Sequence, residues 1–205
     1  MIELLVVVAI IGILAALLLP ALASAKERGR QTACINSVRQ QSLAVLMYAD
    51  EHEDLLPPTA YNDTAGNEVT WPTLLDPYLK SVAKIHLCPT DRASQTNSYG
   101  LNELMFVDLT DANPPPATRA VTVRSPSTVI MQGDLGTEDD FLTARPDTLK
   151  LTVPGATLND DADARPSSRH SGRCDLGFMD GHGEHLFLKQ FYSNQTPTNR
   201  WFLPR

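Results

Sequence analysis

Four potential metal ligands lie close together near the C-terminus, in the stretch RHSGRCDLGFMDGHGEH. They are His170, Cys174, His182 and His185, and a set of histidine and cysteine ligands suits zinc. The spacing matches neither C-x2-C nor H-E-x2-H, and two strands joined by a tight turn alternate their faces, so His182 can point away from His170. The sequence therefore favours a structural role for His170, hydrogen-bonded to a buried carboxylate such as Asp134 or to a turn carbonyl.

Other kinds of catalytic or binding chemistry have little support in the sequence. Ser168, His170 and Ser171 are close together, but the chain has no G-x-S-x-G nucleophile elbow and no glycine-rich phosphate loop. The net charge of −7 argues against nucleic-acid binding through neutralised phosphates. We therefore expect neither an enzyme nor a nucleic-acid partner.

Three strand candidates surround this stretch. They are residues 128–132, 174–179 and 184–188, which are short apolar runs. Asp180-Gly181 separates the last two runs and is a strong signal for a hairpin turn with positive φ. The acidic segment from Asp134 to Arg165 reads as a long loop, and loops of this length are usually functional or mobile.

The middle of the chain reads as short elements joined by loops. Residues 61–70 and the proline-rich residues 111–118 predict loops, the latter an extended surface segment. Residues 71–80 predict a short helix that Pro77 breaks or kinks. Residues 98–102 and 104–107 predict buried, partly extended pieces. We expect residues 55–205 to form one globular domain.

The N-terminus predicts one long helix in two parts. Residues 4–25 are 22 consecutive positions without a charge, and as a helix they span about 33 Å, enough to cross a bilayer. Residues 1–25 therefore form an apolar segment, which Pro20 is expected to interrupt. Residues 26–54 continue as an amphipathic helix that ends before Pro57-Pro58. Their apolar stripe has 3-4-3-4 spacing and consists of Ile35, Val38, Ser42, Val45 and Ala49.

The cysteines suggest the compartment. Cys34, Cys88 and Cys174 allow one disulfide and one remaining thiol, and their spacing leaves the pairing open. We favour Cys34 with Cys88, because Cys88 precedes Pro89 at the end of an apolar segment and the bond would tie the helix to the domain. A persistent disulfide implies the oxidising side of a membrane.

The opening MIELLVVVAIIGILAALLLPAL closely resembles the N-terminal segment of type IV pilins and type II secretion pseudopilins. Glu3 falls on the family's glutamate and Pro20 on its helix-kinking proline. Two residues that the family has ahead of Met1 are not in the sequence, so either the start of the chain was trimmed or miscalled, or Met1 stands where the third mature residue would be. The resemblance implies an α+β lollipop fold, a long helix on a small antiparallel sheet. It also implies that Glu3 pairs with the terminal amine of a neighbouring copy. The implied partners are further copies, a prepilin peptidase and an inner-membrane assembly platform.

The C-terminal half resembles a second signature of pilin-like proteins, H-x9-DG. Its residues here are His170, Asp180 and Gly181, and Cys88-Pro89, residues 99–102 and the strand ending at Asp134 fall where that group has similar residues. The group has no assigned catalytic activity, so the motif implies a structural role.

Calcium is the cofactor that the resemblance suggests, because major pseudopilins have a calcium-stabilised C-terminal loop. The acidic segment offers carboxylate ligands for it, namely Asp139, Asp140, Asp160 and Asp161. No D-x-D-x-D-G loop is present, so a solvated acidic loop stays the favoured interpretation.

Together these features predict a structural subunit of a type IV pilus-like or type II secretion pseudopilus filament. It would wait in the inner membrane and then form an extracellular filament or a periplasmic pseudopilus. The alternative is a membrane-anchored module that does not polymerise and binds a ligand, with or without calcium, or a minor pseudopilin. Glu3 distinguishes them, because an anchor needs only apolar residues.

Overall fold

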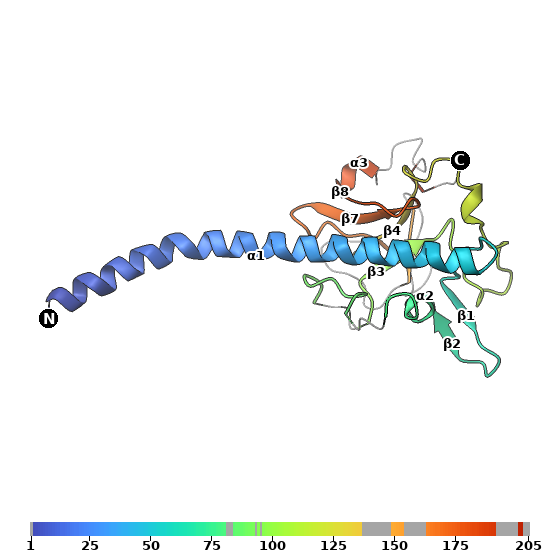
Figure 1. The fold of residues 1–205 in the computed structure, drawn as a ribbon, viewed down its shortest axis with the longest axis horizontal. Coiled ribbons are helices and arrows are strands. Elements are labelled where there is room, and N and C mark those ends of the chain that lie inside the picture. The colour runs from blue at the N-terminus through green and yellow to red at the C-terminus, as the bar shows by residue number, and fades with distance from the viewer. Residues whose placement is uncertain are drawn as a thin grey trace.

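The computed structural model describes residues 2–80, 84–92, 94, 96–136, 149–153, 163–191 and 201–202. One helix, α1 (Ile2–Glu51), projects far beyond a small domain, and its C-terminal half lies against that domain (Figure 1). Its 50 residues span about 75 Å at a rise of about 1.5 Å per residue. The helix ends in the acidic run ahead of Pro57 and Pro58, as the sequence predicted.

Pro20 lies inside α1 without interrupting it, so that prediction was wrong. A proline in a helix removes one backbone hydrogen bond and favours bending. The neighbouring turns keep their own hydrogen bonds, and the helix curves gently in its projecting half (Figure 1).

A six-stranded sheet forms the centre of the domain. Four of its strands are antiparallel neighbours in the order β3 (Tyr99–Asn102), β4 (Ile130–Gly136), β7 (Arg173–Phe178) and β8 (Gly183–Phe187). The predicted strands at 174–179 and 184–188 are present within one residue of their ends, and the strand predicted at 128–132 runs instead to residue 136.

Two further strands lie within the segment predicted as one long loop. β5 (Lys150–Leu151) runs parallel to β3 and to β6 (Asp163–Pro166), and β6 pairs antiparallel with the end of β4. These short pairings occupy backbone groups of β3 and β4 that would otherwise need other partners. The loop prediction was therefore wrong at residues 134–136, 150–151 and 163–165, which are in strands.

The remaining elements are short. Residues 60–70 form a hairpin of β1 (Ala60–Asn62) and β2 (Glu68–Thr70), not the predicted loop, because the Asp63 carboxylate accepts the backbone N–H groups of Ala65 and Asn67 at 2.8 Å and closes the turn. α2 (Trp71–Leu75) stops ahead of Pro77, η1 (Ala120–Thr122) is one 3₁₀ turn, and α3 (Leu188–Phe191) follows β8. Residues 111–118 contain neither helix nor strand, as predicted.

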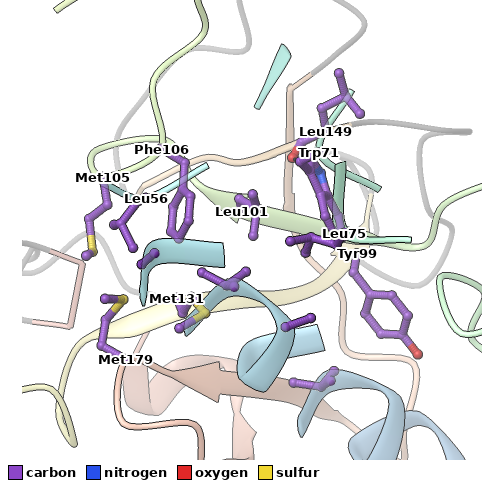
Figure 2. Close-up of a cluster of buried hydrophobic side chains, with 14 of the residues drawn as sticks. Leu56, Trp71, Leu75, Tyr99, Leu101, Met105, Phe106, Met131, Leu149 and Met179 are labelled. Carbon is purple, nitrogen blue, oxygen red and sulfur yellow. The ribbon is translucent and has the colours of Figure 1, made fainter. Parts of the chain in front are cut away.

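Apolar side chains pack on both faces of the sheet. On one face, Leu56, Trp71, Leu101, Phe106 and Met131 gather with the docked half of α1 (Figure 2). On the other face a second cluster forms under α3 and the C-terminal aromatic residues. Its fully buried members are Ile130, Leu135, Leu151, Cys174, Leu176, Phe178 and Phe202. Because the sheet is covered on both sides, the strands read as apolar runs rather than as alternating ones.

The docked half of α1 buries the stripe that the sequence predicted. Ile35, Val38, Ser42, Val45 and Ala49 are all buried. Polar groups support the same contact: the Gln132 side-chain amide donates to the carbonyl of Val38 at 2.7 Å, and the Gln41 amide donates to the carbonyl of Ile85 at 2.6 Å. The helix and sheet are therefore joined by apolar packing and by buried hydrogen bonds.

A glycine allows α1 to approach β7 closely. A Cβ atom at Gly177 would lie 2.4 Å from Ser42 Oγ and 2.9 Å from Val38 Cγ1. Both neighbours belong to the docked face of α1, so a side chain at this position would push the helix away from the sheet.

We predict that Gly177→Ala lowers the free energy of unfolding by about 1–3 kcal/mol, because it overpacks the contact between helix and sheet. Urea titration of the detergent-solubilised chain measures the change. Gly29→Ala is the matched control: no atom lies within 4 Å of its added Cβ, and alanine in a helix stabilises by about 0.5–1 kcal/mol relative to glycine. Equal stability of Gly177→Ala and the wild type would contradict this contact.

Candidate functional sites: the apolar stalk and a buried polar cluster

The projecting half of α1 presents an exposed apolar surface. We call residues 4–25 the stalk; the large side chains that the structure describes there are exposed, as with Leu17 at 71%. The most apolar 18-residue stretch of the helix has a mean hydropathy of 2.9, and no part of this stretch is buried in the domain. The helix is long and apolar enough to cross a membrane. A continuous apolar surface of this size requires lipid or other apolar helices around it.

Glu3 lies in the first turn of α1, on the exposed end of the stalk. The next charged residue along the helix is Lys26. The carboxylate therefore stands alone at one end of an apolar surface, where burial without a cationic partner would be costly.

A disulfide joins the docked half of α1 to the domain. It links Cys34 to Cys88, the pairing favoured from the sequence, with the two Cα atoms 5.3 Å apart. Both residues are buried. The backbone N–H of Cys88 donates to Ser98 Oγ at 3.0 Å, which holds the segment after α2 in place. The third cysteine, Cys174, is a buried thiol on β7.

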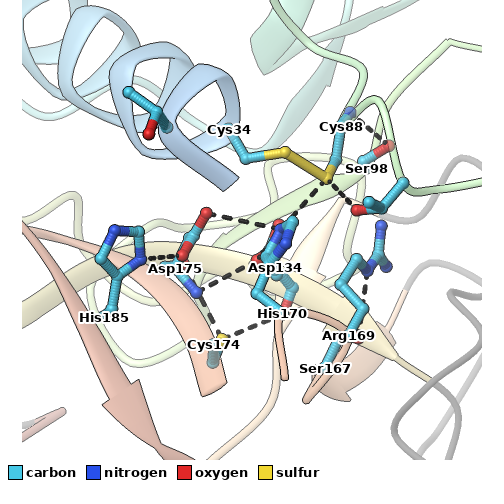
Figure 3. A network of polar contacts seen from close by, with 12 residues as sticks. Cys34, Cys88, Ser98, Asp134, Ser167, Arg169, His170, Cys174, Asp175 and His185 are labelled. Carbon is cyan, nitrogen blue, oxygen red and sulfur yellow. Dashed lines mark hydrogen bonds and ion pairs between the residues drawn. A yellow bond between two sulfur atoms is a disulfide. The ribbon is translucent and has the colours of Figure 1, made fainter. Parts of the chain in front are cut away.

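Three ionisable side chains meet beside this disulfide (Figure 3). We call Asp134, His170 and Asp175 the buried polar cluster, because their side chains have no exposed surface. His170 Nε2 lies 3.5 Å from Asp134 Oδ2, 3.4 Å from Asp175 Oδ2 and 3.3 Å from Cys88 Sγ. β4 supplies Asp134 and β7 supplies Asp175, whose backbone N–H donates to Asp134 Oδ2 at 3.1 Å.

Charged groups from other elements surround the cluster. The Glu27 carboxylate on α1 faces His170 Nδ1 at 3.8 Å, and the His185 ring on β8 contacts Asp175 Oδ1 through Nδ1. Arg169 is close to the cluster but is paired with Asp91: Nη1 lies 3.1 Å from Asp91 Oδ2, and Nη2 donates to the carbonyl of Leu135. The cluster therefore contains two carboxylates and one imidazole, with the nearest guanidinium engaged elsewhere.

Burial shifts the protonation of these groups. It raises the pKa of Asp134 to about 6, and together with the charge of Asp134 it raises the pKa of Asp175 to about 9. Burial and the nearby Arg169 charge lower the pKa of His170 to about 4. Two carboxylates in one buried site repel each other, so without another cation the pair retains a proton at neutral pH.

The zinc set considered from the sequence does not come together. His182 lies at the hairpin turn, where its ring stacks on Phe178 and its backbone N–H donates to Asp180 Oδ1 at 3.1 Å. His170 lies at the other end of β7, beside Asp134 as the sequence suggested, but at a distance beyond the usual range for a hydrogen bond. The two ends of the H-x9-DG motif are therefore apart in space.

The hairpin that the sequence predicted at Asp180-Gly181 is present. Only Gly181 has positive φ, at 87°, and its N–H donates to the carbonyl of Phe178. The N–H of Phe178 in turn donates to the carbonyl of His182, which closes a three-residue loop. This loop is a type I turn followed by a left-handed glycine. The turn sets the strand register that places Asp175 opposite His185.

Sequence reasoning missed Asp175, Arg169 and Asp91. The sequence indicated the hairpin but not its strand register, so the pattern gave no reason to pair Asp175 with His185. The predicted calcium ligands Asp139, Asp140, Asp160 and Asp161 lie outside the described residues.

Comparison with known proteins adds no relative, since no family model, curated protein or solved structure matches the chain.

We predict that removal of the disulfide by the double substitution Cys34→Ser and Cys88→Ser destabilises the chain by about 4 kcal/mol, the value expected for a closed loop of this length. The sequence separation of the two cysteines is 54 residues. Urea unfolding with and without reductant measures the effect. Reductant should destabilise the wild type and leave the double variant unchanged; a reductant effect of the same size on both would contradict the prediction.

We also predict a pH dependence in chelator-treated protein. Asp175 ordinarily titrates near 3.8 and in the folded chain near 9, so the folded state binds the extra proton between these values. The free energy of unfolding should therefore fall as the pH rises from about 7 towards 9, by about 1 kcal/mol per pH unit. Chemical unfolding at several pH values measures the slope.

Asp175→Asn should flatten this slope, because an amide has no proton to lose. Asp180→Asn, at the exposed hairpin turn, is the control and should keep the slope of the wild type. A slope that persists in Asp175→Asn would assign the titration to another group.

Proposed function

We propose that this chain is a structural subunit of a type IV pilus-like or type II secretion pseudopilus filament. The observation that carries the proposal is one continuous helix with two environments: an exposed apolar stalk, and a docked half joined to the domain by a buried disulfide. In the membrane, lipid surrounds the stalk. In a filament, the stalks of neighbouring copies surround one another.

The attachment of the helix supports a role in which force passes between stalk and domain. Apolar packing against β7, the Cys34–Cys88 bond and the buried Gln41 and Gln132 hydrogen bonds all resist sliding of α1 along the sheet. A subunit that is extracted from a bilayer into a filament needs this connection. A simple anchor needs only enough apolar surface to stay in the membrane.

Glu3 supports assembly over simple anchoring. A carboxylate at the end of an apolar stalk is costly in lipid, and a cationic group from another copy would offset that cost. Transfer of the stalk from lipid to a bundle of similar helices gains little from the hydrophobic effect itself. Helix packing and the pairing of Glu3 would therefore decide whether subunits associate.

A membrane-anchored module that does not polymerise is the second candidate. The exposed stalk favours it equally, since lipid alone covers an apolar helix. In both cases we propose an inner-membrane location for the unassembled chain. The two functions differ in what they require of Glu3.

We predict that Glu3→Leu abolishes filaments and leaves the chain in the membrane fraction, because the substitution keeps the apolar stalk and removes the charge. Electron microscopy of material sheared from cells, with the subunit identified by mass spectrometry, measures assembly. Glu3→Asp is the matched control and should retain filaments, in reduced number, since it keeps the carboxylate. Filaments of Glu3→Leu in wild-type amounts would exclude the proposed pairing, and a wild type without filaments would favour the anchored module.

A further inference from the structure

We infer that the buried polar cluster is a binding site for a divalent transition-metal ion, with zinc as the best match, held by Asp134, His170 and Asp175. The inference is independent of filament assembly, because the three proposed ligands are buried side chains of the domain, whereas assembly uses the exposed stalk and Glu3. It also differs from the calcium site that was considered for the acidic segment.

The distances between the three side chains fit a metal better than they fit hydrogen bonds. His170 Nε2 lies 3.5 Å from Asp134 Oδ2 and 3.4 Å from Asp175 Oδ2, beyond the usual range of about 2.7–3.2 Å for N–H···O. Two ligands that each lie about 2.0–2.1 Å from a tetrahedral zinc ion are about 3.3–3.4 Å apart. The distance from the nitrogen to each oxygen is therefore close to that between two ligands of one small ion, and one ligand atom from each of the three residues lies within 4.8 Å of the others.

Three polar atoms of the cluster lack hydrogen-bond partners among the described residues. Asp134 Oδ1, Asp175 Oδ2 and His170 Nδ1 are buried and make no hydrogen bond there. Buried acceptors without a partner carry a high free-energy cost, and a bound ion is one of the ordinary explanations. Asp134 Oδ1 would be available as a fourth donor if this carboxylate bound the metal through both oxygens.

Neighbouring side chains orient two of the three ligands, as outer hydrogen-bond partners do in metal sites. The Glu27 carboxylate faces His170 Nδ1 at 3.8 Å, which favours the proton on Nδ1 and leaves the lone pair of Nε2 directed at the two carboxylates. His185 holds the other oxygen of Asp175. A carboxylate behind a ligating histidine, and a second hydrogen bond on a ligating carboxylate, are typical of protein metal sites.

Charge also favours a divalent cation. Two carboxylates and a neutral imidazole carry a charge of −2, and Arg169, the nearest guanidinium, is paired with Asp91 at 3.1 Å. One divalent ion would neutralise the cluster without protonating either carboxylate. The competing occupant is a proton shared within the cluster, and this is the outcome against which the site must be tested.

The donor set selects the kind of metal. Calcium takes about 6–8 oxygen ligands at about 2.3–2.6 Å, whereas this cluster is small, buried and includes an imidazole. One nitrogen and two carboxylates suit zinc and its first-row neighbours. Cys88 Sγ lies 3.3 Å from His170 Nε2 but is bonded to Cys34 in the disulfide, so it is not a thiolate ligand in the oxidised chain.

The experiment uses the full chain in detergent, produced with zinc in the medium and purified without chelator. Elemental analysis by mass spectrometry should find about one zinc ion per chain. Asp134→Asn and Asp175→Asn should each lower this content at least tenfold. Asp180→Asn and His182→Gln, which alter the exposed histidine–aspartate pair at the hairpin turn, are the matched controls and should keep the content of the wild type.

A second measurement does not depend on the variants folding. The wild type is unfolded, freed of metal and refolded with a chelator, with Zn²⁺ or with Co²⁺. Zn²⁺ should raise the thermal midpoint above that of the chelator sample, and Co²⁺ should give the visible absorption of a four-coordinate ion.

Two results together would overturn the inference: the wild type is purified without bound metal, and it refolds with the same thermal midpoint in Zn²⁺ and in chelator. The cluster would then hold shared protons instead of a metal ion. Metal content that survives both cluster substitutions and disappears in His182→Gln would also overturn it, because the metal would then belong to the hairpin turn.

Discussion

The contact between the second half of α1 and the β7–β8 hairpin is the constraint on which the rest of the structure depends. Gly177 leaves room for Ser42 and Val38 of the helix, and the Cys34–Cys88 bond fixes the neighbouring turn of the helix to the domain. Once this half is docked, the first half of the same rigid helix must project away from the domain. The exposure of the stalk is thus a mechanical consequence of the docking.

The buried polar cluster lies at the same junction. Its members come from β4, from the turn before β7 and from β7 itself, and the disulfide that holds α1 is 3.3 Å from the ring of His170. A protein interior tolerates two neighbouring carboxylates only when protons, cations or hydrogen bonds compensate their charge. Whatever occupies the cluster therefore contributes to the connection between helix and sheet, and its loss would weaken the attachment of the stalk.

The proposed assembly and the proposed metal site concern different parts of this arrangement. Assembly depends on the stalk and on Glu3, which lie outside the domain. The metal site depends on side chains that the sheet brings together, and it would stabilise the domain in a monomer as well as in a filament. Glu27 is close to both, because it lies on α1 just after the stalk and faces His170 at 3.8 Å.

Sequence alone determined the features that depend on local pattern. The 22 uncharged positions of the stalk, the 3-4-3-4 stripe from Ile35 to Ala49 and the hairpin around Gly181 were all readable, because helix period, apolar length and turn chemistry are properties of neighbouring residues. The continuity of α1 through Pro20 could not be read from the sequence, since a single proline can either bend or break a helix.

Only the tertiary structure decided which polar residues meet. Asp134, His170 and Asp175 are brought together by strand pairing, and the three-residue turn sets the register that places Asp175 opposite His185. A shift of one residue changes every cross-strand neighbour, so the pairing of Asp175 with His185 could not be read from composition or spacing. The buried polar cluster therefore depends on the strand register, which is set by the pairing of the whole sheet.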